Sequence, residues 1–199
     1  MENINTPEYW NNVYKHEEEW RLYPNTFEMI SNVVGSKQRV IEFGCGTGIL
    51  AYILAENKNN VIGLDISTQA CFKYNKRNMT SEAVAYQANL LIMPSVNVPS
   101  GTIAVASEFL EHFTDEELNI IMPKIKYAAP KAIFCVPNDC LDNDQCDEHY
   151  QRFTKDSLRS FLSKYYNKVL VIDFIDQFNS YKGLVRLPVL MAVCEGKSE

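Results

Sequence analysis

The feature that most constrains this chain is an apolar strand pattern that runs directly into three closely spaced glycines. Residues 39–43 form the strand pattern, Gly44, Gly46 and Gly48 follow, and a helix pattern begins at about Gly48. Glycine lets the backbone turn sharply and approach a ligand closely, and a helix N-terminus adds N–H groups and partial positive charge. The segment predicts a strand–turn–helix unit whose turn can bind a ligand, although such turns also serve purely structural roles.

The rest of the chain repeats this alternation of strand and helix patterns. Because strands separated by helices form parallel sheets, the pattern predicts an α/β fold with helices on both faces of the sheet. The connection over 175–187 has no clear helix pattern, so the two strands that it joins are expected to be antiparallel partners. Pro123 predicts that its helix is kinked or ends early. Further strands are predicted at 60–65, 83–88, 102–106, 131–136, 169–174 and 188–194, and further helices at 67–77, 115–127 and 154–165.

The first part of the chain predicts a helical prefix over residues 1–36, ahead of a single α/β domain over residues 37–199. Thr6 can cap the first helix, and Pro7 suits its first position. A second helix is expected over 26–34, ended by Gly35.

Composition excludes several classes of protein. With 46% hydrophobic and 22% charged residues, the 199-residue chain is expected to fold. The net charge of −6 disfavours a nucleic-acid partner, since such proteins carry basic surfaces. Prolines and a glycine interrupt the longest uncharged run, 90–107, so no membrane span is predicted, and the polar start predicts no signal peptide. The six cysteines are expected to be reduced thiols of a cytoplasmic protein, and no metal site is predicted from them because none forms a Cys-x-x-Cys pair.

Two carboxylates make a ligand-binding turn the better interpretation. Glu42 interrupts the apolar strand just before the glycines, where an ammonium group of a ligand would explain it. Asp65 ends the second strand, where a carboxylate can accept hydrogen bonds from a ribose diol. The spacing is Gly-x-Gly-x-Gly, with Ile49 at the third position of the dinucleotide fingerprint, so a nicotinamide or flavin dehydrogenase is disfavoured.

With these motifs, about residues 37–195 resemble the class I S-adenosylmethionine (SAM)-dependent methyltransferases. Residues 42–48 resemble the first motif of the family, 63–67 the second and 107–113 the fourth, and 135–138 and 149–154 match later segments. The resemblance implies a Rossmann-like methyltransferase fold: a seven-stranded, mainly parallel sheet with an antiparallel last strand and helices on both faces. It also implies SAM as the cofactor.

The resemblance further implies how the cofactor is held. Asp65 would bind the ribose hydroxyls, Ile66 would lie against the adenine, and Glu42 would serve the amino-acid end. Asn89 stands where the family usually has an acidic residue contacting the adenine amine; its carbonyl oxygen can accept from that amine and its amide can donate to a ring nitrogen. The expected cofactor-binding residues are Trp10, Glu42, Gly44, Cys45, Gly46, Gly48, Asp65, Ile66, Asn89, Leu90 and Glu108.

The resemblance places the prefix helix over the cofactor as a lid carrying Trp10 and Tyr14, although these aromatics could equally be core anchors. His112 and His149 are the candidate catalytic bases, because histidine titrates near neutral pH; both also have ordinary structural interpretations. His16 is expected to be solvated. The acidic residues within 137–152 predict either a lid that favours a cationic acceptor or, more simply, a solvated loop.

Three functions stay open. The first is methyl transfer to an oxygen, nitrogen or sulfur atom of a small molecule. The alternative is a metal-dependent small-RNA 3′-terminal 2′-O-methyltransferase, because Glu108, Glu111, His112 and His149 resemble the metal site of those enzymes. The third is a non-catalytic scaffold, which the intact Glu42, glycine and Asp65 set argues against. The oligomeric state is not predicted.

Overall fold

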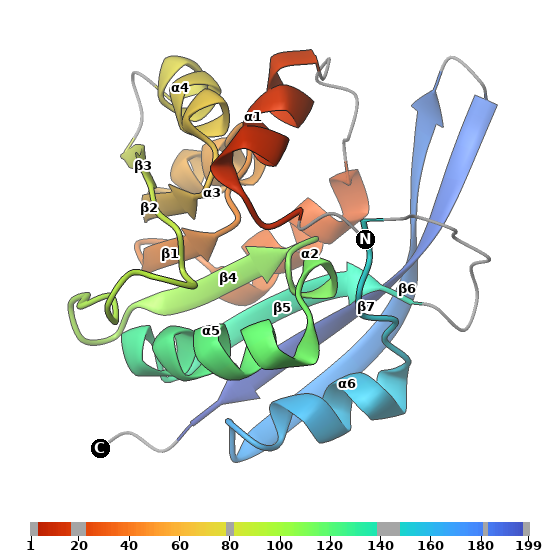
Figure 1. Ribbon diagram of the computed structural model, residues 1–199. Helices are drawn as coiled ribbons and strands as arrows, with labels where there is room; N and C mark the ends of the chain where they lie inside the picture. Colours follow the sequence, from red (N-terminus) through yellow and green to blue (C-terminus); the bar gives the residue numbers. More distant parts are fainter. Residues whose placement is uncertain (1–3, 17–22, 79–81, 139–147, 181–182, 197–199) are drawn as a thin grey trace.

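The computed structural model describes residues 4–16, 23–78, 82–138, 148–180 and 183–196 (Figure 1). One seven-stranded sheet runs through it in the order β3-β2-β1-β4-β5-β7-β6. The strands are β1 (Arg39–Phe43), β2 (Asn60–Asp65), β3 (Ala83–Gln87), β4 (Ile103–Ser107), β5 (Lys131–Pro137), β6 (Lys168–Ser180) and β7 (Gly183–Glu195). The helices are α1 (Pro7–His16), α2 (Pro24–Val34), α3 (Ile49–Glu56), α4 (Thr68–Arg77), α5 (Asp115–Ala128) and α6 (Lys155–Leu162), with a short 3₁₀ turn η1 (Leu110–His112).

The strand directions confirm the predicted sheet. Strands β1 to β5 pair in parallel, whereas β7 is antiparallel to both β5 and β6. Parallel strands need crossover connections, and the helices between them supply these. The fold is therefore the α/β architecture expected from the alternating pattern, in the Rossmann-like arrangement that the resemblance implies.

Two apolar cores lie on the two faces of the sheet. Ile30, Leu54 and Tyr74 of α2, α3 and α4 are fully buried against one face. Leu118 of α5 and Leu158 of α6 are buried in the core of the other face, and Figure 1 shows α5 and α6 side by side on that face. Because α2 contributes to the same core as α3 and α4, residues 24–34 pack as part of the domain; the predicted boundary at residue 36 stays a prediction.

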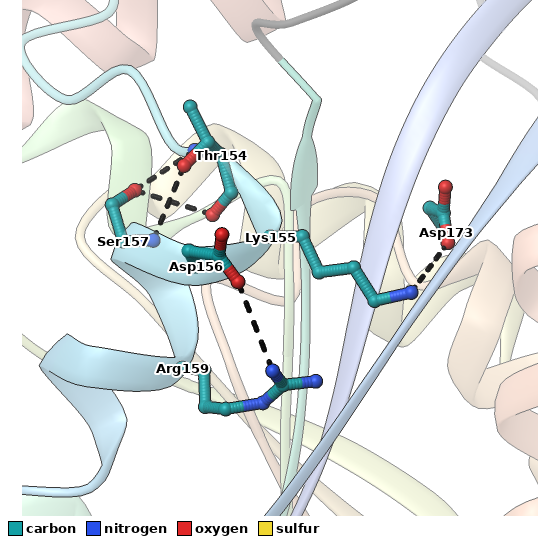
Figure 2. Close-up of polar contacts among 6 residues, drawn as sticks. All are labelled: Thr154, Lys155, Asp156, Ser157, Arg159 and Asp173. Carbon is teal, nitrogen blue, oxygen red and sulfur yellow. Dashed lines mark hydrogen bonds and ion pairs between the residues drawn. The ribbon is translucent and has the colours of Figure 1, made fainter.

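Local capping signals set the helix starts. Thr114 and Glu117 form a capping box at the start of α5. Thr154 and Ser157 cap α6 in the same reciprocal way, as Figure 2 shows, and Lys155 anchors this helix to Asp173 of β6 at 2.8 Å. The pair of Asp156 and Arg159 is at 3.8 Å and largely exposed, so it contributes little.

Two boundary predictions were wrong, and one of the two alternatives for Pro123 is excluded. Helix α5 does not end early at Pro123 but continues to Ala128, because Pro123 lies on the exposed side while Ile121 and Ile125 hold the helix in the core; the kink stays a prediction. Helix α6 ends at Leu162 and not at residue 165. The connection expected over 175–187 is mostly strand, since β6 and β7 pair from Lys168–Glu195 to Ser180–Gly183.

The side chains of Asp176 and Asn75 form hydrogen bonds with main-chain groups of other helices or strands. The buried carboxylate of Asp176 in β6 accepts hydrogen bonds from the N–H groups of Asn25 (3.2 Å) and Thr26 (2.9 Å) at the start of α2. The side-chain amide of Asn75 in α4 pairs with both the N–H and the carbonyl of Ala85 at 2.8 and 3.0 Å. Because β3 is an outer strand of the sheet, this pairing covers part of its open edge.

Several simpler expectations can be compared with the same structure. Cys45, Cys71, Cys135 and Cys194 are free thiols, as expected of reduced cysteines, and His16 is exposed. Among the described residues, no helix is long and apolar enough to cross a membrane. The acidic part of the 137–152 segment, with Cys140 and Cys146, lies outside the described residues over 139–147.

Candidate active site

The predicted site residues gather at one edge of the sheet. Because β1 to β5 are parallel, the segments that follow their carboxyl ends meet at that edge. The glycine turn follows β1, Asp65 ends β2, Asn89 follows β3 and Glu108 follows β4. Residues far apart in sequence therefore lie along a single line of loops, which is where ligands bind in open α/β sheets.

The glycine turn has the strained backbone that its sequence predicts. The φ angles are +68° at Gly44, +49° at Gly46 and +78° at Gly48, a backbone conformation that residues with side chains rarely adopt. A Cβ on Gly44 would also lie 2.3 Å from the ring of Phe109, and one on Gly48 would lie 2.6 Å from the ring of Tyr74. Glycine is thus required both by the turn and by the aromatic rings packed against it.

Asp65 is oriented by the glycine turn. One carboxylate oxygen accepts the Gly46 N–H at 2.9 Å, and the other accepts the Ser67 N–H at 2.8 Å. Burial raises the pKa of Asp65 to about 6, against the lowering effect of these hydrogen bonds. Since each carboxylate oxygen can accept two hydrogen bonds, both keep capacity for a ribose diol.

Glu42 is a buried acid whose ligand is not supplied by the described part of the chain. Its side chain is only 4% exposed, and its Oε2 has no hydrogen-bond partner among the described residues. Burial, followed by repulsion from Asp65, raises the pKa of Glu42 to about 8. An unpartnered buried carboxylate is costly, and a cationic ligand would offset that cost. Glu42 Oε2 can accept a hydrogen bond from an ammonium group such as that of SAM.

The segment after β3 differs in detail from the expectation. The side-chain oxygen of Asn89 accepts the Leu91 N–H at 2.9 Å, so it already serves a local turn, and the side-chain amide is left as the better group for an adenine nitrogen. Leu90 is buried in the core, and Cys45 is buried beside Gly63. Contacts of Cys45 and Leu90 with a cofactor would therefore involve their backbones. Ile66 is partly exposed beside Asp65.

A second cluster lies after β4. Glu111 is 1% exposed, and neither of its carboxyl oxygens has a hydrogen-bond partner among the described residues. Burial and the nearby Glu108 raise the pKa of Glu111 well above its ordinary value. Glu108 itself has a φ of +51°, an uncommon conformation for a residue other than glycine. The cluster thus combines backbone strain with a buried, unpartnered acid, a combination typical of functional sites.

The two candidate histidines are brought together in this cluster. The rings of His112 and His149 lie 5.2 Å apart, and His112 Nε2 is 4.0 Å from Glu111 Oε1. His112 Nδ1 is 3.0 Å from the carbonyl oxygen of Glu148, which can only accept. Nδ1 therefore carries a hydrogen, and in the neutral ring Nε2 presents its lone pair. Main-chain N–H groups of Tyr150 and Gln151 bind the Glu111 carbonyl and hold this segment against η1.

Helix α1 connects the glycine turn with the histidine cluster. Tyr14 lies over Gly46, whose Cβ would be 3.0 Å from the tyrosine hydroxyl, and the ring of Trp10 lies 5.0 Å from that of His112. The Tyr9 hydroxyl donates to Glu148 at 2.6 Å. Trp10 is buried, as the core-anchor interpretation of this helix expects, and the lid over a cofactor stays a prediction.

Sequence reasoning did not find the side chains that fasten α1. Asn5 donates to the His112 carbonyl at 2.8 Å, and Asn11 accepts from the Ser67 hydroxyl at 2.8 Å. These contacts join residues more than fifty positions apart, and a polar side chain on a short helix carries no local signal of such a partner.

Comparison with known proteins indicates a methyltransferase domain. Residues 40–128 match a family of methyltransferase domains. A magnesium protoporphyrin IX methyltransferase from Synechocystis, solved with S-adenosylhomocysteine (SAH), matches with a TM-score of 0.67 and 14% identity, covering 95% of this chain and 98% of that one. The methyltransferase domain of bacterial CtHen1-CN matches with a TM-score of 0.63 and 18% identity, covering 86% and 96%.

A third structure, from work on the conversion of a disulfide bond into a thioacetal group during echinomycin biosynthesis, has a TM-score of 0.74 and 15% identity, covering 98% of this chain and 94% of that one. No curated protein sequence matches this one significantly. At these identities the structural matches show the fold, and because 869 solved chains match, the fold does not identify the acceptor.

The methyltransferase-domain match covers residues 40–128, and the fold and the site agree with those of class I SAM-dependent methyltransferases. The methyltransferase domain identifies the chain as an enzyme, and the similar Synechocystis methyltransferase was solved with SAH and with SAM bound, which supports SAM as the cofactor. The resemblance seen in the motifs is thereby confirmed, and the domain match argues against the interpretation as a non-catalytic scaffold.

Proposed function

We propose that this enzyme transfers the methyl group of SAM to an oxygen, nitrogen or sulfur atom of a small-molecule acceptor held at the histidine cluster. The observation that carries the proposal is the arrangement along one sheet edge: the Glu42 and Asp65 site on one side, His112 and His149 on the other, and α1 touching both. SAM supplies an electrophilic methyl group on a sulfonium. The protein must then place a nucleophile in line with that methyl, about 3–3.5 Å from it.

Glu42 serves the amino-acid end of the cofactor in this proposal. The sulfonium loses its charge during transfer, so a carboxylate beside the sulfur would stabilise the ground state more than the transition state. A carboxylate at the ammonium group binds the cofactor without that cost. Asp65 accepts from the ribose, and Asn89 and Ile66 serve the adenine. Trp10, Cys45, Leu90, Glu108 and the three glycines complete the proposed cofactor site.

His112 and His149 act on the acceptor. A hydroxyl acceptor needs a base as it attacks, whereas a thiolate or neutral amine does not. The lone pair of His112 Nε2 faces Glu111, and His149 adds a second imidazole within ring contact. A ring nitrogen of either His112 or His149 can take the proton of a hydroxyl acceptor.

The proposed acceptor is a small molecule and not a nucleic acid, and the proposed location of the enzyme is the cytoplasm. The charge of −6 supports the exclusion of polyanions, and the free thiols support a reducing compartment.

The test uses radiolabelled methyl transfer to a panel of small hydroxyl, amine and thiol acceptors, followed by variants with an accepted substrate. His112→Ala and His149→Ala should each lower kcat on a hydroxyl acceptor by about 10²-fold, and SAH binding should stay within twofold, about the limit of the measurement. His16→Ala, at an exposed histidine of α1, is the matched control. Full turnover by the double variant His112→Ala/His149→Ala would refute the placement of the acceptor.

A specific observation favours the second candidate, a metal-dependent small-RNA 3′-terminal 2′-O-methyltransferase. The ligand atoms of Glu111, His112 and His149 all lie within 4.8 Å of one another. The Nδ1 hydrogen bond of His112 to a carbonyl is also the usual way in which a metal-binding histidine is oriented. A divalent cation there would lower the pKa of a ribose hydroxyl. Glu108, the fourth residue of the expected metal site, is not among the three described residues whose ligand atoms come together.

The two candidates predict opposite responses to chelation. If the metal is required, EDTA should abolish methyl transfer, Mn²⁺ or Co²⁺ should restore it, and an RNA 3′ end should be a substrate. Activity on a small molecule that persists in EDTA removes the second candidate.

A further inference from the structure

Lys124 of α5 reaches across to the loop that follows β3. Its ammonium group donates to the carbonyl oxygens of Leu90 at 2.6 Å, Leu91 at 3.4 Å and Met93 at 2.8 Å. A single charged side chain thus binds three main-chain oxygens of one short loop, 31 to 34 residues away in sequence.

That loop is a single helical turn. Among the described residues, no main-chain N–H donates to the carbonyls of Leu90, Leu91 or Met93. Ile92 and Met93 donate to the Asn89 carbonyl at 3.2 and 2.9 Å, and Leu91 donates to the Asn89 side chain. The carbonyls at the end of such a turn have no next turn to bind, and a lysine ammonium can satisfy them. Lys124 therefore acts as a C-terminal cap supplied by another element.

The loop belongs to the cofactor site. Ala88, directly before it, donates its N–H to the Asp65 carbonyl at 2.7 Å, and Asn89 is the residue expected at the adenine. The turn that Lys124 caps is the same turn that occupies the Asn89 side-chain oxygen and so sets which group of Asn89 is presented. The orientation of Asn89 and the position of the Ile92 segment depend together on this cap.

We propose that Lys124 is a positioning residue that holds the Asn89 turn in the conformation that recognises the adenine of SAM. The inference rests on the proposed cofactor site and names a residue outside every motif of the sequence. Its role is confined to adenine recognition, because none of these three hydrogen bonds reaches Glu42, Asp65 or the histidine cluster.

The experiment compares Lys124→Met with Lys126→Met by calorimetry, using SAH and adenosine as ligands. Lys126 is the matched control because it lies on the same helix, is similarly half-buried, and places its ammonium 5.5 Å from the ring of Tyr166 instead of at the loop. Lys124→Met should weaken binding of both ligands by about tenfold, and Lys126→Met should weaken neither. At saturating SAM, kcat of Lys124→Met should equal that of the wild type.

Further variants separate a positioning role from a structural one. Lys124→Arg keeps a charged donor and should recover most of the affinity, and Lys124→Gln replaces the methionine variant if that fails to fold. Glu42→Gln should weaken SAH but leave adenosine unchanged, since adenosine lacks the amino-acid end.

Each outcome decides a different point. Normal binding of both ligands by Lys124→Met, or a loss seen for SAH but not for adenosine, overturns the role of Lys124 alone. Failure of the wild-type protein to bind either ligand overturns the cofactor site itself, and the inference with it.

Discussion

The raised pKa of Glu42 predicts that cofactor binding releases a proton. In the free protein this pKa is about 8, so at pH 7 only about one molecule in ten carries the carboxylate. An ammonium group binds the carboxylate form and lowers this pKa in the complex. The proton leaves on binding, and affinity must rise with pH.

The size of the effect follows from the ionised fraction. If only the carboxylate form binds, the apparent Kd is about 11 times its limiting value at pH 7 and about twice that value at pH 8. SAH binding should thus tighten about fivefold between these two pH values. Glu42→Gln should bind SAH at least about tenfold more weakly at pH 8 and should lack this part of the pH dependence.

The assay is calorimetry in two buffers of different ionisation heat at pH 7, which counts the protons exchanged. The wild type should release about 0.9 proton more than Glu42→Gln. Glu28→Gln, an exposed glutamate of α2, should behave as the wild type. Equal proton release by the wild type and Glu42→Gln would refute the assignment of Glu42 to the ammonium group, and a large fall in kcat at saturating SAM would place Glu42 nearer the reacting atoms.

The same pKa has a consequence for the free protein. Since folding raises the pKa of Glu42 from 4.5 to about 8, its contribution to stability is complete below pH 4.5 and is lost as the pH rises through about 8. The loss is at most about 5 kcal/mol, the free-energy equivalent of this shift. Glu42→Gln should therefore gain thermal stability relative to the wild type between pH 5 and pH 9, and a constant difference across that range would contradict the buried acid.

Three further predictions concern contacts that hold the site in place. Asp176→Ala should lower the free energy of unfolding by about 2–3 kcal/mol in urea titrations, because it leaves the N–H groups at the start of α2 without acceptors. A change below about 0.5 kcal/mol, which is the usual scatter for surface substitutions, would contradict this capping role of Asp176. Asn75→Ala should increase self-association in light scattering, since it uncovers the edge of β3, and an unchanged monomer–oligomer balance at high concentration would argue that the edge is protected otherwise. Gly44→Ala should abolish SAH binding because its Cβ would overlap Phe109, and normal binding would show that the turn can move.

Much of the fold could be predicted because its signals are local. Residues within a few positions of one another produce the glycine turn after the first strand and the alternation of strands and helices. The same holds for the helix caps at Ser67, Thr114 and Thr154. The errors arose where a local rule met tertiary packing. Pro123 is tolerated inside α5 because its neighbours are buried, and β6 and β7 extend because each supplies the other with main-chain partners.

Local sequence also predicted some of the site residues and not others. Residue types and spacing were enough to select Glu42, the glycines and Asp65, because a carboxylate in an apolar strand and a glycine turn are unusual locally. The use of the Asn89 oxygen by its own turn could not be read from the motif, since that depends on the backbone conformation.

The sequence by itself determined the order of the strands and helices, the position of the glycine turn and the family to which these motifs point, since backbone preference and hydrophobic period act over short distances. Only the tertiary structure decided which distant side chains complete the site. Asn5 and Asn11 fasten α1, Lys124 caps the Asn89 turn, and Glu111 is buried beside two histidines. A hydrogen bond or a desolvated charge depends on distance in space, and the chain sets that distance only when it folds.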